Sequence, residues 1–155
     1  GGYGWGRIYP NTYLLSLYDQ AKDTRYNELF VHRFKYNDPT SPKYGELIPL
    51  TQSSSYCETL HFMSKKYFDQ WTMADNPDRT TGFKDLIVYR LAETYLMAAE
   101  AYMRRDGGMS TDALRCYNKT WERAGNDKFA GPLTQDILLD EYARELNFEA
   151  FAGLC

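Results

Sequence analysis

The stretch Asp85-Leu-Ile-Val-Tyr-Arg-Leu-Ala-Glu-Thr-Tyr-Leu-Met-Ala-Ala-Glu-Ala-Tyr-Met-Arg104 decides the fold, because it predicts a long, deeply packed helix. It holds no Gly or Pro and is rich in Leu, Met, Ala and Glu, which lose least on entering a helix. One predicted face carries Ile87, Val88, Leu91, Ala92, Tyr95, Ala98, Ala99 and Tyr102, and a second apolar flank carries Leu86, Tyr89, Leu96 and Met103. The positions expected to face water are Arg90, Thr94, Met97, Ala101 and Arg104. A helix that is apolar on two sides packs between neighbouring elements.

Two more helices are predicted after this stretch. Gly107-Gly108 ends the first helix, and Ser110 or Thr111 can cap the second one. The apolar stripe of the second helix is Ala113, Cys116, Tyr117, Thr120, Trp121 and Ala124, and Gly125 closes it. Thr134 can cap a third helix, whose inward positions are Leu138, Leu139, Tyr142, Ala143, Leu146 and Ala150. The first two helices form an antiparallel hairpin that resembles a tetratricopeptide unit, although no second copy is visible.

The first half of the chain is rich in loops. A short helix is predicted to start at Pro10-Asn11-Thr12 and to run through Tyr18, and Phe30, His32, Phe34 and Tyr36 alternate as in a strand. Residues 37–42 form a turn cluster, and 59–63 is a further candidate strand. The predicted fold class is mainly α: a tetratricopeptide-like helical hairpin or superhelix with long irregular loops and a few short β-strands. Residues 1–84 are the loop-rich candidate ligand-binding surface, and residues 85–155 are the helical region.

Composition excludes some classes of protein. The 155 residues carry a net charge of −3, with acids and bases interspersed, and this argues against nucleic-acid binding. No uninterrupted apolar run reaches the roughly 18 residues of a membrane span. Cys57, Cys116 and Cys155 have no metal-binding spacing and show no disulfide framework. Both ends look cut, so we expect the chain to be part of a longer protein and a larger domain.

Acidic and imidazole side chains are the first candidates for catalysis. The acids at helical spacing are Glu93, Glu100, Glu141, Glu145 and Glu149, and they lie in reach of Arg90, Arg123 and Arg144. Because acids on packed helices are usually paired, we expect ion pairs between helices instead of a glycosidase pair. His32 and His61 stand outside any metal-binding motif, and neither a nucleophile elbow nor a phosphate-binding glycine loop is present. We therefore expect no enzyme activity, no metal and no cofactor.

Aromatic residues in loops are the candidate binding residues. A sugar site needs an aromatic face for the C–H side of the ring and polar groups for the hydroxyls. The candidates are Trp5, Tyr9, Tyr36, Tyr44, Tyr56 and Trp71, with Asn37 and Arg79 among the polar partners. Each aromatic taken alone also fits a packing role, because aromatic rings bury well.

Three motifs together resemble the C-terminal half of a SusD/RagB-family protein. The signature Arg-Leu-Ala-Glu-x-Tyr-Leu-x-x-Ala-Glu-Ala is matched over residues 90–101, and an Asn followed by Arg-Ala-Gly is matched by Asn118 and residues 123–125. The motif Glu-x-Ala-Arg-Glu-Leu-x-Phe-Glu is matched over 141–149, and residues 10–25 resemble the family's Pro-Thr…Asp-x-Arg entry. The family usually continues with Gly and Arg, whereas this chain reads Ala150-Phe151-Ala152-Gly153-Leu154-Cys155.

The resemblance implies a lipid-anchored protein on the outer face of a Bacteroidetes outer membrane. Such a protein captures oligosaccharide or another small nutrient and works with a TonB-dependent, SusC-like transporter. The lipid anchor would lie upstream of this segment. Two alternatives stay open: a tetratricopeptide-like interaction module without its own ligand site, and a SusD-like protein that binds a non-glycan nutrient such as peptide.

Overall fold

The computed structural model describes residues 9–48, 62–66, 69, 84–85 and 87–149. It divides into two compact units: Gly1–Asn11 with Asn27–Lys84, and Thr12–Tyr26 with Asp85–Cys155. The second unit is built from helices, and the described strands, all in the first unit, are two residues long each. The prediction of a mainly α fold with a few short strands is confirmed.

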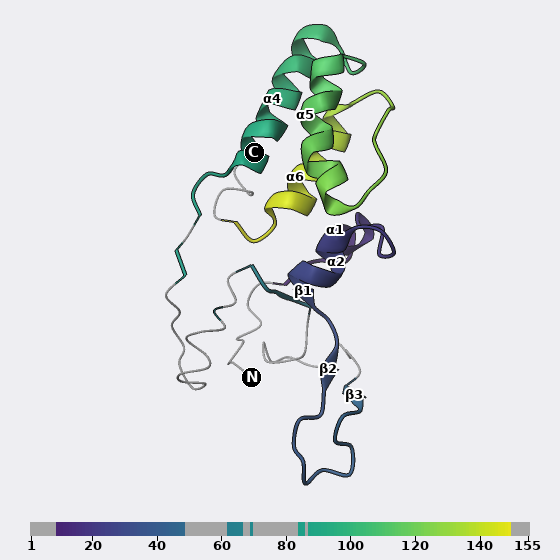
Figure 1. The fold of residues 1–155 in the computed structure, drawn as a ribbon, viewed down its shortest axis with the longest axis vertical. Helices are drawn as coiled ribbons and strands as arrows, with labels where there is room; N and C mark the ends of the chain where they lie inside the picture. The colour runs from purple at the N-terminus through teal and green to yellow at the C-terminus, as the bar shows by residue number, and fades with distance from the viewer. Residues whose placement is uncertain (1–8, 49–61, 67–68, 70–83, 86, 150–155) are drawn as a thin grey trace. The chain divides into compact units, whose positions relative to one another are not determined.

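Three helices form the body of the second unit (Figure 1): α4 (Leu91–Asp106), α5 (Thr111–Trp121) and α6 (Gln135–Leu146). Helix α5 continues into the short 3-10 turn η1 (Glu122–Ala124). Helices α4 and α5 lie side by side as an antiparallel hairpin, and α6 packs against both. The predicted hairpin is therefore present.

The beginning of α4 differs from the prediction. Residues 87–90 are not helical, and Arg90 has extended backbone angles (φ −146°, ψ 161°). The Arg90 guanidinium, expected to face water, is instead half-buried and reaches Glu145 in the last turn of α6 and Glu149 just after it. In a helix the backbone fixes the direction in which the Arg90 side chain points. The extended backbone at Arg90 gives its side chain a different direction, in which it forms ion pairs with Glu145 and Glu149.

The residues around the late start of α4 are exposed to solvent. Ile87, Val88 and Tyr89 are exposed, and so is Leu91 at 67%, although all four were expected on apolar faces. Leu86 lies outside the described residues. Further along α4 the pattern holds, because Leu96 and Ala99 are buried while Thr94, Met97, Ala101 and Arg104 are exposed. On α6, Leu138 and Leu146 are buried as expected, but Leu139 is 43% exposed and was wrongly placed inside.

The helix ends are formed by the residues that the sequence indicated. The Ser110 hydroxyl accepts a hydrogen bond from the Ala113 amide, and the Thr134 hydroxyl accepts one from Ile137. Gly107 and Gly125 have φ values of 87° and 90°, and this left-handed region favours glycine. Each cap satisfies amide or carbonyl groups that the helix leaves without partners.

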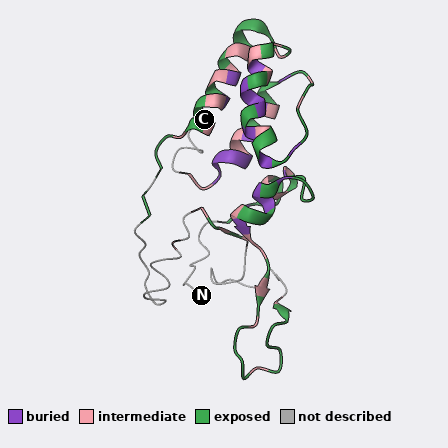
Figure 2. Ribbon diagram, in the orientation of Figure 1, coloured by how far each residue is buried: buried purple, intermediate pink, exposed green. Residues whose placement is uncertain are grey.

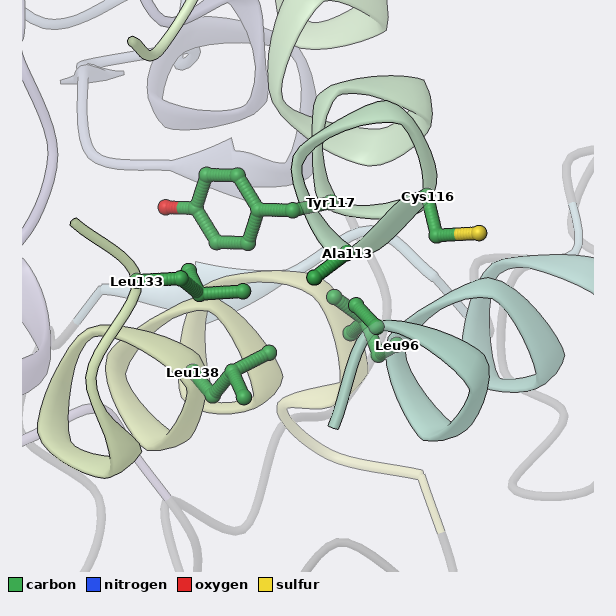
Figure 3. Packing of buried hydrophobic residues seen from close by; sticks show 7 residues of the cluster. Leu96, Ala113, Cys116, Tyr117, Leu133 and Leu138 are labelled. Atoms are coloured by element: carbon green, nitrogen blue, oxygen red, sulfur yellow. The ribbon is translucent and has the colours of Figure 1, made fainter. Parts of the chain in front are cut away.

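The core lies between the three helices (Figure 3). It contains Leu96 and Ala99 of α4, Ala113, Cys116 and Tyr117 of α5, Leu138 of α6, and Leu133 of the loop before α6. The Tyr117 ring packs against Phe129 with ring centroids 5.1 Å apart. Asn118 fixes this loop, because its amide donates to the Phe129 carbonyl and its side-chain oxygen accepts from the Phe129 amide. In Figure 2, buried positions line the inner side of the hairpin.

The segment Thr12–Tyr26 joins these helices through buried polar groups. It holds α1 (Thr12–Ser16), which confirms the predicted short helix, and the start of α2 (Thr24–Leu29), which was not predicted. The Tyr18 hydroxyl donates to the Arg144 carbonyl at 2.9 Å, and Arg25 forms ion pairs with Glu141 and Glu145. The segment is therefore part of the helical unit.

The first unit contains two small antiparallel sheets. Strand β1 (Phe30–Val31) pairs with β4 (Met63–Ser64), and β2 (Phe34–Lys35) pairs with β3 (Leu47–Ile48). The single strand expected over residues 30–36 is thus interrupted at His32 and Arg33. The reason is that its two halves find different partners, which period-2 alternation does not reveal. Of the candidate strand 59–63, residues 59–61 lie outside the described part.

Candidate functional site

The β2–β3 hairpin carries three of the predicted binding residues. The Tyr36 amide donates to the Glu46 carbonyl at 3.0 Å, while the Gly45 amide donates to the Tyr36 carbonyl at 2.9 Å. Two residues on one strand thus oppose a single residue on the other, which is a β-bulge. Gly45 takes the left-handed conformation (φ 82°) that such a bulge requires. The bulge sets where the loop leaves the sheet.

The loop of this hairpin is held by its own hydrogen bonds. The Ser41 amide donates to the Asp38 carbonyl, and the Tyr44 amide donates to the Ser41 carbonyl. The Asp38 carboxylate accepts from both the amide and the hydroxyl of Thr40, at 2.9 and 2.7 Å. The Thr40 hydroxyl, together with its amide, lowers the pKa of Asp38. Two successive turns and a charged cap give the loop a defined shape before any ligand binds.

Tyr36, Asn37 and Tyr44 are displayed on this loop and its flanking strands. Tyr44 is 60% exposed, Asn37 is exposed, and Tyr36 is half-buried. The Lys43 ammonium lies 5.7 Å from the centre of the Tyr36 ring, within the range of a cation–π interaction. An exposed tyrosine, a second aromatic ring and a side-chain amide are thus held on one short hairpin.

Of the other predicted site residues, the structure describes Tyr9. Tyr9 belongs to the same compact unit and is half-exposed. Trp5, Tyr56, Trp71 and Arg79 lie outside the described residues, and so do His61, Cys57 and Cys155. Cys116, the remaining cysteine, is a buried free thiol in the core.

Sequence reasoning missed the basic side chains of the hairpin. Arg33, Lys35 and Lys43 are all exposed. The signal was present in the alternation of residues 30–36, where Arg33 and Lys35 occupy the positions between the aromatic ones. We used that alternation only to predict a strand.

His32, at the junction between β1 and β2, has a packing contact. Its ring stacks on Phe62 with centroids 5.2 Å apart and planes 15° apart. Burial lowers the pKa of His32, and the positive charges of Arg33 and Lys65 lower it further. Within the described residues, no cluster of three or more His, Cys, Asp or Glu side chains is arranged to hold a metal ion.

Three of the five acids, Glu141, Glu145 and Glu149, form ion pairs with distant segments, as predicted. The prediction is wrong for the other two: Glu100 pairs with Arg104 of its own helix, and among the described residues no ion pair of Glu93 is found. Glu141 pairs with Arg25 and Arg144 at 2.8 Å, and Glu145 pairs with Arg25 and Arg90 at 2.8 and 2.6 Å. Arg123 also pairs with Glu145, and Arg90 pairs with Glu149. Asp23 completes the cluster with a 2.7 Å pair to Arg25. Four acids and four arginines thus neutralise one another between α6, the start of α4, η1 and the segment Thr12–Tyr26.

The family model described as SusD family matches residues 1–152. The chain belongs to the SusD family. No curated protein and no solved structure matches the chain. Membership of this family indicates a nutrient-binding protein of the outer membrane, and SusD family proteins are binding proteins. Among the helices of the described residues, none has the length and apolar character needed to cross a membrane.

The motifs shared with the SusD family lie in the packed helical unit. Arg90 and Arg123 reach Glu145, and Asn118 fixes the loop beside Phe129. Gly125 stands where an added Cβ would lie 2.8 Å from the Lys22 carbonyl oxygen. In this chain these residues hold the fold together, whereas three of the candidate binding residues, Tyr36, Asn37 and Tyr44, lie on the β2–β3 hairpin of the other unit.

Proposed function

We propose that this SusD-family chain is the cell-surface glycan-binding component of a nutrient uptake system. It captures oligosaccharide and passes it to a TonB-dependent, SusC-like transporter of the outer membrane. It binds without hydrolysing its ligand, and a lipid anchor outside this segment holds it at the membrane. Trp5, Tyr9, Tyr56, Trp71 and Arg79 belong to the proposed binding surface together with the hairpin residues.

The observation that carries this proposal is the hairpin with Tyr36, Asn37 and Tyr44. Aromatic rings cover the apolar face of a sugar, and side-chain amides bond its hydroxyls. The internal hydrogen bonds of the loop supply preorganisation, which reduces the entropy lost on binding. The buried carboxylates of Glu141 and Glu145 are committed to ion pairs, and this supports binding without glycoside hydrolysis.

The test is calorimetric titration of the full-length protein with a panel of neutral and acidic oligosaccharides and with peptides. Binding of a glycan without turnover is expected. Replacing Tyr36 and Tyr44 together by Ala should weaken it roughly tenfold or more, since each stacked ring contributes on the order of 1 kcal/mol. Trp71→Ala tests the part of the surface outside the described residues. Tyr89→Ala, an exposed tyrosine of the helical unit, is the matched control and should leave glycan affinity unchanged. Binding of peptide alone would overturn the glycan assignment.

A second candidate function is supported by the start of α4. Large apolar residues are exposed just before α4, at Ile87, Val88 and Tyr89, and within it, at Leu91 and Met97. Several exposed apolar side chains in one stretch of chain are more than the scattered single ones of an ordinary surface, and the transporter is the partner that family membership suggests. Replacing Leu91 and Met97 by Glu should release the transporter in a pull-down and leave glycan titrations unchanged if this face docks the partner. Retention of both activities would remove the candidate.

A further inference from the structure

The chain passes between the two compact units at three places, after Asn11, after Tyr26 and after Lys84. Close to each passage, a side chain of the helical unit bonds to an acid of α6 or of the residues just after it. The three anchors are Tyr13 on Asp140, Arg25 on Glu141 and Glu145, and Arg90 on Glu145 and Glu149. Residues 27–84, which carry the β2–β3 hairpin, are therefore anchored to the α6 region at both ends.

Glu145 joins the two ends of residues 27–84. Its Oε2 atom accepts a hydrogen bond from Arg25 at 2.8 Å, and its Oε1 atom accepts one from Arg90 at 2.6 Å. Arg25 lies just before this stretch of chain, and Arg90 lies shortly after it. One carboxylate, whose side chain is 2% exposed, thus closes the base of the stretch.

The anchor at Arg25 is fixed. Its side chain is 5% exposed, and that of its partner Asp23 is 1% exposed. Among the described residues Asp23 has no other ion pair, so withdrawal of Arg25 would leave a buried carboxylate without a cation. An uncompensated buried charge is costly. This end of residues 27–84 therefore stays attached as long as the helical unit is folded.

The anchor at Arg90 opens at lower cost. The Arg90 side chain is 23% exposed and the Glu149 side chain is 14% exposed, so water reaches both groups. When Arg90 withdraws, Glu145 keeps Arg25 and Arg123 as partners. Because Glu145 is not left without a cation, the penalty that fixes Arg25 does not apply here.

The segment that leads to Arg90 is exposed and irregular. Residues 87–90 lie outside any helix or strand, and the side chains of Ile87, Val88 and Tyr89 are exposed. Among the described residues, the backbone of Ile87 and of Val88 forms no hydrogen bond. Arg90 donates four hydrogen bonds, all of them to Glu145 and Glu149. Segments with few buried contacts open locally before the rest of a fold, and these four hydrogen bonds oppose the opening.

We propose that residues 87–90 form a releasable strap. Arg90 leaves Glu145 and Glu149 while α4, α5 and α6 stay folded, and this releases the end at which the chain returns from residues 27–84. Arg25 keeps the other end attached. Residues 27–84 thus have one permanent and one reversible attachment to the α6 region, independently of which ligand the hairpin binds.

Limited proteolysis of the full-length protein with chymotrypsin tests the strap. Chymotrypsin cleaves after tyrosine, and Tyr89 lies in the strap while Tyr95 and Tyr102 lie in α4. A protease cuts the opened form, so the rate of each cut reports how often its segment opens. Arg90→Gln removes hydrogen bonds to charged groups and should raise the rate of cleavage after Tyr89 roughly tenfold or more. The cuts after Tyr95 and Tyr102, assigned and timed by mass spectrometry, should not accelerate.

Three further variants separate release of the strap from a general loss of stability. Arg90→Lys keeps the charge but not the planar fork of arginine, so its rate should lie between those of the parent protein and Arg90→Gln. Glu149→Gln weakens part of the anchor and should accelerate the same cut by a smaller factor. Arg104→Gln is the matched control, because it removes an exposed arginine that pairs with Glu100 within α4, and it should not change cleavage after Tyr89.

Selective acceleration of the cut after Tyr89, in Arg90→Gln and to a smaller extent in Glu149→Gln, supports the strap. If the cuts after Tyr89, Tyr95 and Tyr102 accelerate together in either variant, Arg90 is an ordinary part of the global fold and the strap is overturned. An unchanged rate after Tyr89 in Arg90→Gln overturns it as well, since other contacts would then hold the segment.

Discussion

Arg25 and Glu141 are 116 positions apart in the chain, yet Arg25 Nη1 lies 2.8 Å from Glu141 Oε1 in a site from which water is almost excluded. Asp23 and Glu145 bond to the same guanidinium. Burial alone lowers the pKa of Arg25, but hydrogen bonds and charge from Asp23 and Glu141 outweigh burial and raise it. This pair attaches the segment Thr12–Tyr26 to α6.

Replacing Arg25 by Gln is expected to destabilise the protein strongly. The change leaves the buried carboxylates of Asp23, Glu141 and Glu145 without their shared cation, which costs about 3–5 kcal/mol. Arg115→Gln is the matched control, because Arg115 pairs with Asp112 on the surface, where solvent screens the charges, and its loss should change stability far less. Urea unfolding followed by circular dichroism measures both. Similar losses for the two variants would contradict a special role for Arg25.

The stability of the helical unit should fall in acid. Burial raises the pKa of Glu145, but Arg90, Arg123 and Arg25 together lower it more, and its pKa ends below the ordinary value of 4.5. A carboxyl group with a depressed folded pKa stabilises the fold above its unfolded pKa, and this contribution is lost as pH falls through the folded pKa. The melting temperature should therefore drop once the pH is below about 4.5.

Glu145→Gln tests the assignment of this acid sensitivity. The variant should be less stable at pH 7 and should lose less stability than the parent protein between pH 5 and pH 3. Glu122→Gln, at an exposed position of η1, is the control and should keep the parent profile. If the stability of Glu145→Gln falls between pH 5 and pH 3 as steeply as that of the parent protein, other carboxylates cause the acid transition.

Replacing three glycines by Ala distinguishes the cost of backbone strain from the cost of steric overlap. Gly107 has a φ of 87° and open space around it, so Gly107→Ala should cost about 1 kcal/mol from conformation alone. An added Cβ on Gly108 would lie 2.2 Å from the Leu133 carbonyl oxygen, and the loop before α6 would have to move. We expect Gly108→Ala to cost about 1–3 kcal/mol, as overpacking does.

Gly125→Ala combines both effects, because its φ is 90° and its Cβ would approach the Lys22 carbonyl oxygen at 2.8 Å. Of the two replaced glycines with positive φ, Gly125 should therefore lose more stability on replacement by Ala than Gly107. Thermal melts of the three variants give the order. A loss at Gly107 equal to that at Gly125 would mean that the contact with Lys22 does not restrain the fold.

Removing either helix cap is expected to cause a small loss of folding stability, independent of the other. Ser110→Ala and Thr134→Ala each remove a hydroxyl that accepts an amide hydrogen bond, and each should cost about 1 kcal/mol. The double variant should cost the sum, because the caps serve different helices. Ser16→Ala is the control, since the Ser16 hydroxyl only donates to the Tyr13 carbonyl on the exposed helix α1. A loss from Ser16→Ala as large as from either cap would contradict the assignment.

The residues of the candidate site stay predictions as binding residues. Tyr36, Asn37 and Tyr44 were selected as loop aromatics and a polar neighbour, and the structure places all three on one hairpin. Their role in binding stays a prediction.

The sequence by itself determined the features that depend on neighbours within a few residues. Ser110, Thr134, Gly107 and Gly125 mark helix ends, and the period of apolar residues places α4, α5 and α6, because caps and helical faces are local properties. The tertiary structure decided the partners of Arg25 and Arg90, the late start of α4, and the division of residues 30–36 between two sheets. Those features depend on groups far away in the chain, whose attraction outweighs the weak helix or strand preference of the local sequence. No local pattern of residues specifies which distant group a side chain or strand will contact.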